Sequence, residues 1–145
     1  MEINGEFKMK STDILLKERG LEDMGRVQKY IDNAVINYMK DYTPFQTGTL
    51  QNSPHWYTKI GSGLIVQSTP YARYLYYGKK YGPNIPIIRN GIVEGWFSPP
   101  VKHPTGENLH YQGEPKRGAF WFERMKTDHA TDILKGAQAE ANKGV

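Results

Sequence analysis

The chain has 145 residues, a formal net charge of +4 at pH 7 and no cysteine. That length has room for one hydrophobic core, so we expect a single domain over residues 1–145. The absence of cysteine excludes disulfide bonds and thiolate metal sites. No apolar run approaches the ~18 residues of a membrane span and no secretory signal is recognisable, so we expect the chain to stay in the cytosol.

The first forty residues are predicted to form one strand and two helices. Residues 1–10 alternate apolar and polar side chains, which predicts a strand. Ser11 or Thr12 can cap a short helix that ends at Gly20. A longer helix is expected over residues 22–40, because apolar side chains recur there every three or four positions. These positions are Met24, Val27, Ile31, Ala34, Val35, Tyr38 and Met39.

The middle of the chain is predicted to contain a hairpin followed by a short helix. Residues 55–60 and 64–69 have strand composition and are joined by Gly-Ser-Gly, which favours a tight turn. Residues 70–78 begin with proline and end with glycine, as a two-turn helix does. The helical spacing predicts a core-facing side and an outer side. We expect Tyr71, Tyr74, Leu75 and Tyr77 to face the core, and Arg73 and Tyr76 to face away from it.

The remaining third is predicted to form a long loop and a last helix. Residues 79–117 are rich in proline and glycine, and we expect a long, mobile loop there. Residues 118–138 have helical composition and an apolar ladder. The element order predicts an α+β fold in which a small antiparallel sheet packs against the N-terminal and C-terminal helices, with the long loop before the last helix.

The composition does not favour an enzyme. The four histidines lack the close spacings of zinc sites, and no phosphate-binding loop, dinucleotide fingerprint or nucleophile elbow is present. We therefore expect no catalytic residue, no metal and no cofactor. A cationic, tyrosine-rich block without Asp or Glu between Asp41 and Glu94 leaves nucleic-acid binding as an alternative.

Three segments together resemble a known family. "YTPFQTGTLQNS" at 42–53, "TPYARYLYYG" at 69–78 and "RGAFWFERMKTD" at 117–128 are similar to minor capsid proteins of tailed bacteriophages, the neck or connector proteins of long-tailed phages. The segments at 18–35 and 103–111 resemble that family too.

The resemblance implies a non-enzymatic virion component at the head-to-tail junction, made in the host cytoplasm and built into a ring. The implied partners are further copies of the chain and other neck, portal or tail proteins, with at most transient, non-specific contact with genomic DNA. Neither a membrane nor a small-molecule substrate is implied.

Two sets of residues are candidates for such contacts. Tyrosine, tryptophan and arginine are enriched at interface hot spots, and Trp121 and Phe122 cannot both face one core. The candidate assembly interface is Arg73, Tyr76, Tyr77, Arg117 and Trp121. The candidate DNA-facing cations are Lys79, Lys80, Arg89 and Lys116, and the nucleic-acid alternative adds Arg117 to them.

Overall fold

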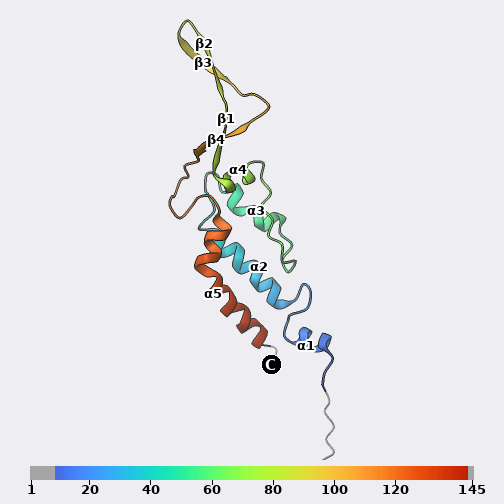
Figure 1. Cartoon of the computed structure of the whole chain (residues 1–145). Helices are drawn as coiled ribbons and strands as arrows, with labels where there is room; N and C mark the ends of the chain where they lie inside the picture. The colour runs from blue at the N-terminus through green and yellow to red at the C-terminus, as the bar shows by residue number, and fades with distance from the viewer. Residues whose placement is uncertain (1–8, 144–145) are drawn as a thin grey trace, which may run out of the picture.

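Two helices from opposite halves of the chain form the core. The computed structural model describes residues 9–143. Helix α2 (Arg26–Met39) and helix α5 (Trp121–Asn142) lie side by side (Figure 1). The buried apolar residues of the two helices are Val27, Ala34, Ile36 and Met39 from α2 and Trp121, Met125 and Ala137 from α5. The two long helices predicted over 22–40 and 118–138 are thus confirmed, although both begin a few residues later than expected.

The close approach of these helices depends on Gly136. A Cβ atom at this position would overlap the phenol ring of Tyr30, which lies on α2. Glycine inside a helix costs about 1 kcal/mol relative to alanine, so its presence here is explained by packing rather than by helix propensity. Gly136 therefore helps to set the distance between α2 and α5.

Two short helices begin or end where their caps predict. Helix α1 (Thr12–Glu18) follows Ser11, whose hydroxyl accepts the N–H of Ile14. Helix α4 (Ala72–Tyr77) ends at Gly78, which has a left-handed φ of 67° and donates its N–H to the Tyr74 carbonyl. The strand predicted over 1–10 falls mostly on residues 1–8, outside the described part of the chain.

The hairpin predicted at 55–69 is wrong. Residues Thr49–Tyr57 form helix α3 instead, and residues 58–69 contain no strand. Pro54 lies inside this helix, and the Leu50 carbonyl accepts hydrogen bonds from the Ser53 hydroxyl and from the side chain of Gln67. Those two donors compensate for the N–H that proline lacks.

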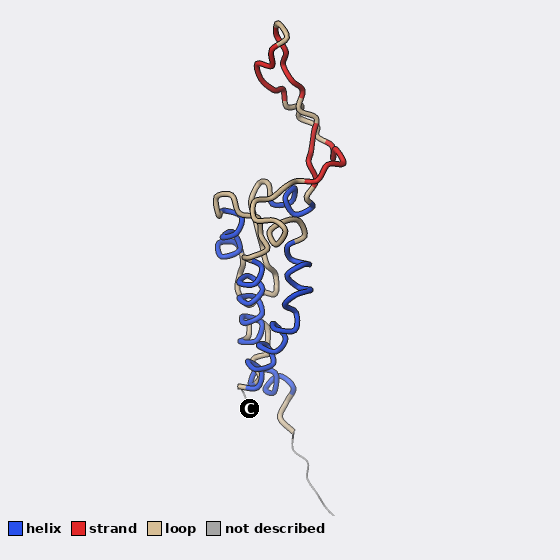
Figure 2. Tube along the Cα trace, turned by 90° about the vertical axis from the view of Figure 1, so that its left-hand side faces the viewer, coloured by secondary structure: helices blue, strands red, loops and turns tan. Residues whose placement is uncertain are grey.

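The predicted loop at 79–117 contains four strands. Strand β1 (Lys79–Gly82) pairs antiparallel with β4 (His103–Asn108), and β2 (Ile85–Arg89) pairs antiparallel with β3 (Ile92–Phe97). The two pairs follow one another and form an arm that projects from the helical body (Figures 1 and 2). We call residues 79–108 the arm and β2–β3 its outer ribbon.

The α+β class is confirmed, but the strands occupy an unexpected position. The expectation placed one small sheet on the helices, whereas the structure has two separate two-stranded sheets in the arm. Among the helices of residues 9–143, none combines the length and the apolar character that crossing a membrane requires.

Candidate assembly interface

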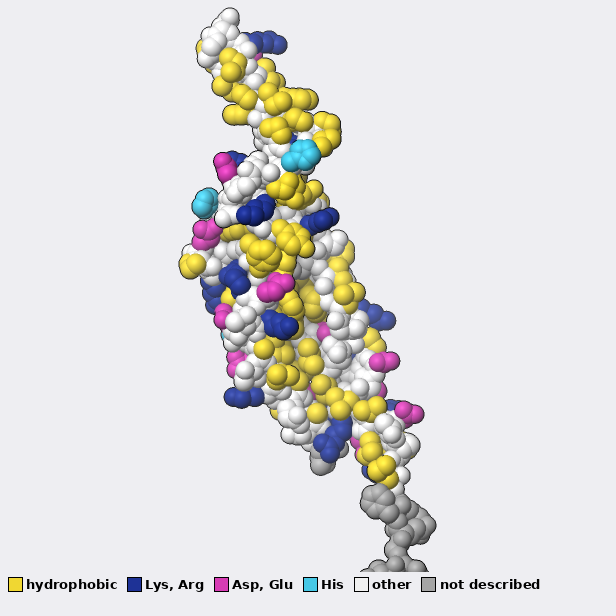
Figure 3. All heavy atoms as spheres, viewed as in Figure 1, with side chains coloured by type: hydrophobic (Ala, Val, Ile, Leu, Met, Phe, Trp, Pro, Cys, Tyr) yellow, Lys and Arg dark blue, Asp and Glu magenta, His cyan; other side chains and the backbone are white. Residues whose placement is uncertain are grey.

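The outer ribbon exposes large apolar side chains that a folded chain normally buries. Every residue of β2 is exposed, and so are all those of β3 except Gly95. Trp96 is 65 % exposed and Ile92 67 % exposed. Apart from Tyr81, eight large apolar side chains of the arm are exposed in this way: Ile85, Ile87, Ile88, Ile92, Val93, Trp96, Phe97 and Val101. Figure 3 shows hydrophobic side chains along much of the projecting arm.

The ribbon is apolar on both of its faces. Its register pairs Ile85 with Phe97 and Ile88 with Val93. Side chains alternate between the faces along β2, so Ile85 and Ile88 lie on opposite faces. The register shifts between Ile87 and Ile88, which leaves Glu94 unpaired on β3 and keeps Val93 opposite Ile88. Trp96, paired with Pro86, lies on the same face as Ile88 and Val93. Both faces of the ribbon therefore expose apolar side chains to solvent.

A two-residue turn determines this register. Asn90 and Gly91 have φ values of 51° and 76°, and they connect the paired residues Arg89 and Ile92. Positive φ at both central residues defines the type I′ turn, for which Asn-Gly is a strongly preferred sequence. The sequence prediction missed this hairpin, although "RNGIV" between apolar runs carries its signal.

The base of the arm is attached to the helical body. The Leu109 N–H donates to the Gly78 carbonyl, and the Tyr111 hydroxyl donates to the carbonyl of Leu75. The rings of Tyr74 and Tyr81 meet edge to face, with centroids 4.9 Å apart. The arm is thus fixed on α4, and α4 packs on the core through Ala72, Leu75 and Tyr76.

The predicted assembly residues divide into exposed and packed positions. Arg73 and Tyr77 are exposed, as a contact with a partner requires. Trp121 is only 2 % exposed and donates its indole N–H to Gln67, so it is a core residue and its proposed place on an exposed patch is wrong. Tyr76 packs against Trp121 with ring centroids 4.7 Å apart.

The predicted orientation of the short helix is also wrong. Tyr71, Tyr74 and Tyr77 were expected in the core and are exposed, whereas Tyr76 was expected outside and packs inward. Arg117 is half-buried, and its guanidinium donates to the carbonyls of Lys40 and Thr43. Its first role in the subunit is therefore to join the start of α5 to the end of α2.

The candidate DNA-facing cations do not form one patch. Lys79 and Lys80 lie in β1, Arg89 lies beside the turn of the outer ribbon, and Lys116 lies in the segment before α5. All four are exposed, and each has a partner, respectively Asn108, Glu107, Glu94 and Asp41. Exposed ion pairs contribute little to stability, but the carboxylates beside Lys80, Arg89 and Lys116 reduce the positive potential offered to phosphate, whereas Asn108 beside Lys79 is neutral.

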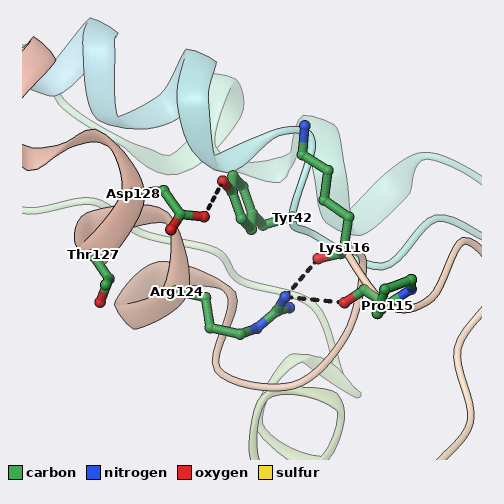
Figure 4. A pocket seen from close by; sticks show the side chains of 6 residues that line it. All are labelled: Tyr42, Pro115, Lys116, Arg124, Thr127 and Asp128. Atoms are coloured by element: carbon green, nitrogen blue, oxygen red, sulfur yellow. Dashed lines mark hydrogen bonds between the residues drawn. The ribbon is translucent and has the colours of Figure 1, made fainter.

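A hollow beside Tyr42 contains the polar side chains that most resemble an active site (Figure 4). The Tyr42 hydroxyl donates to the Asp128 carboxylate at 2.6 Å. This hydrogen bond, together with burial and the negative charge of Asp128, raises the pKa of Tyr42 above its ordinary value. The phenol therefore stays protonated at neutral pH and acts as a donor that joins the end of α2 to α5.

The cations around this hollow have structural partners. The Arg124 guanidinium donates to the backbone carbonyls of Pro115, Lys116 and Ala119, and so fixes the segment that leads into α5. Within residues 9–143, no group of three or more histidine and carboxylate side chains could hold a metal ion.

Comparison of the chain with protein-family models, with curated proteins and with solved structures finds no match.

Proposed function

We propose that this protein is a structural component of the head-to-tail junction of a tailed bacteriophage, where it works by assembling into a ring with copies of itself and by contacting neck, portal or tail proteins. The observation that carries this proposal is the apolar arm. A two-stranded hairpin is marginally stable in water by itself, and apolar patches of this size normally mark interaction sites. The arm is therefore suited to a subunit whose exposed apolar side chains become buried against neighbouring subunits.

The area of the arm supports a protein partner. Each of the eight apolar side chains exposes roughly half of its surface, and the two aromatic ones, Trp96 and Phe97, have about 150–250 Å² each to bury, so the arm can contribute a substantial part of an interface. A standard protein interface uses about 800 Å² from each partner.

The family resemblance supports the phage context. Its three main segments, 42–53, 69–78 and 117–128, meet in the helical body. The Gly118 N–H donates to the carbonyl of Tyr42, and the Phe120 N–H donates to that of Tyr76. The resemblance therefore concerns one contiguous part of the fold.

The alternative, a nucleic-acid-binding module, is less well supported because the arm cations are separated and paired. Titration with DNA at two salt concentrations tests it. We expect weak binding that is indifferent to sequence and disappears as salt rises, because only phosphate contacts would contribute. Sequence-selective binding at physiological salt would favour the alternative.

Complementation of a phage that lacks this gene tests the proposed function. We expect the wild-type gene to restore plaques and a labelled copy of the protein to appear at the neck of intact virions. A Trp96→Asp variant should fold but leave heads and tails unjoined, because it places a charge on the face meant for a partner.

Leu134→Asp provides the matched control, because Leu134 is 68 % exposed and lies on α5, away from the arm. This variant should restore plaques normally. The proposal fails if the gene proves dispensable for joining heads to tails, or if the labelled protein is missing from virions.

A further inference from the structure

We infer that the outer ribbon of one copy docks into a groove of the next copy that is bordered by α2, residues 63–67 and the start of α5. Its apolar lining includes Ile31, Val35, Ile65, Tyr76 and Phe122, and the almost wholly buried Trp121 lies at its base. Figure 3 shows hydrophobic side chains in a band along the middle of the body as well as along the arm. This inference rests on the proposed ring assembly and identifies the contact that would build the ring.

The ribbon and the groove have matching lengths. The groove follows α2 over the twelve residues from Gln28 to Met39, which at 1.5 Å per residue is about 18 Å. Strand β2 has five residues, and at about 3.3 Å per residue it has nearly the same length. One ribbon can therefore cover the groove from end to end.

The buried polar groups of Asp32 and Trp121 in the groove already have hydrogen-bond partners within the subunit. The Asp32 carboxylate accepts the N–H groups of Gly61 and Gly63 and the side-chain amide of Gln28. The Trp121 indole donates to Gln67. An apolar ribbon could cover these groups without leaving an unsatisfied donor, and the Asp32 carboxylate would keep its three N–H donors.

The ribbon does not bring an unpaired charge either. Its two charged residues, Arg89 and Glu94, lie 3.4 Å apart and form an ion pair. Ile88, Val93 and Trp96 share one face with Pro86, and tryptophan is among the residues that most often dominate binding. We assign this face to the groove.

Docking through a face is favoured over pairing of strand edges. The β2–β3 ladder continues across Pro86 in register with Trp96. Proline is tolerated there because its nitrogen, which has no hydrogen, belongs on the outer edge of an edge strand. The same proline hinders a further strand from adding at that edge.

The occupant must come from another copy. The stem of β1 and β4 holds the ribbon beyond the end of the body, away from the groove of its own subunit (Figures 1 and 2). Every chain carries both a ribbon and a groove, and these are different surfaces. Such a head-to-tail contact propagates from copy to copy and can close into a ring.

Cross-linking of single-cysteine variants tests the contact directly, because the natural chain contains no cysteine. Purified Val93→Cys protein is mixed with purified Phe122→Cys protein at high concentration and treated with a short bismaleimide. We expect a cross-linked dimer in the mixture, little or none with either variant alone, and loss of the product when Trp96→Asp is added to the Val93→Cys chain.

Leu134→Cys replaces Phe122→Cys in the control, since it offers an exposed thiol on the same helix outside the groove. Ile31→Cys serves as a second groove variant, and melting curves establish that each protein is folded. A Val93–Val93 product as the main species would show that arms pair with arms and would overturn the inference. The inference would also be overturned if Val93→Cys gave no more cross-linked dimer with the groove variants than with Leu134→Cys.

The outcomes separate this inference from the proposed function. Cross-linking of ribbon to groove in a protein that phage particles lack would leave the inference standing and refute the function. Conversely, a protein needed at the neck whose ribbon does not link to the groove would refute the inference alone.

Discussion

The carboxylate of Asp32 accepts the backbone N–H of Gly61 at 2.7 Å, although the two residues are 29 positions apart in the sequence. The same oxygen accepts the N–H of Gly63 at 3.1 Å. Asp32 is buried on α2, so the Gly-Ser-Gly segment is attached to this helix. The attachment positions Ile65 and Gln67 at the groove, with Gln67 holding Trp121.

Asp32→Ala is expected to lower the free energy of unfolding by roughly 3 kcal/mol, because it leaves the buried N–H of Gly61 without an acceptor. Urea unfolding measures the change. Asp132→Ala is the control, since Asp132 is exposed and, within residues 9–143, pairs only with His129, and it should change stability by no more than about 0.5 kcal/mol. Equal midpoints for the two variants would contradict the structural role of Asp32.

Gly136→Ala is expected to destabilise the protein by about 1–3 kcal/mol, the usual cost of overpacking, although alanine is the better helix former. The new Cβ would overlap the ring of Tyr30. In a chain that already carries Tyr30→Ala, Gly136→Ala should cost less stability than it does in the wild type, because the clashing ring is gone. A double-mutant cycle by thermal unfolding measures this coupling. Additive effects of the two substitutions would contradict the close approach of the helices.

Tyr42→Phe is expected to cost about 1 kcal/mol at neutral pH by removing the hydrogen bond to Asp128. The pKa of Tyr42 is raised in the folded protein, so its contribution is complete below the unfolded value of about 10 and is lost as pH rises through the folded pKa. The stability difference between wild type and Tyr42→Phe should therefore shrink above about pH 10.

Denaturant unfolding between neutral pH and about pH 11 provides the measurement. Tyr71→Phe is the matched control, because Tyr71 is exposed and no hydrogen bond of its hydroxyl is found within residues 9–143. A Tyr42→Phe difference that grows with pH would show that the sign of this linkage is wrong.

Arg117→Ala and Arg73→Ala are expected to differ in their effect on the stability of the fold. Arg117→Ala is expected to destabilise the fold by about 1–3 kcal/mol, because it leaves the carbonyls of Lys40 and Thr43 with one donor fewer. Arg73 is exposed, so its replacement should change stability by about 0.5 kcal/mol or less. Thermal melting of both proteins tests this, and a larger loss from Arg73→Ala would reverse the assignment.

Gly91→Val is expected to disrupt the outer ribbon without weakening the core. Valine is strained at a φ of 76°, and the ribbon contributes no residue to the core cluster. The melting temperature should stay close to that of wild type. In amide hydrogen exchange, we expect the arm of the wild type to exchange faster than α2, and the Gly91→Val arm to lose its remaining protection. Gly95→Ala is the control, because nothing lies near its added Cβ. A fall of several degrees with Gly91→Val would show that the ribbon belongs to the cooperative core.

Local patterns in the sequence determined much of the helical framework. The periodic apolar positions of α2, the Ser11 cap and the Gly78 stop act within one or two helical turns, so they can be recognised without knowledge of the rest of the fold. The same is true of Asn90-Gly91, whose turn signal was present in the sequence and was overlooked.

Only the tertiary structure decided which side chains are buried and where the hairpin lies. Gly-Ser-Gly favoured a turn between strands, but its conformation depends on Asp32, a distant residue on another element. Tyr76 and Tyr77 are neighbours of one residue type, and their burial differs because Trp121 of α5 packs against Tyr76. Candidate interface residues chosen by type alone therefore included core residues and missed the arm, because the free energy of burial depends on which surfaces come together in space.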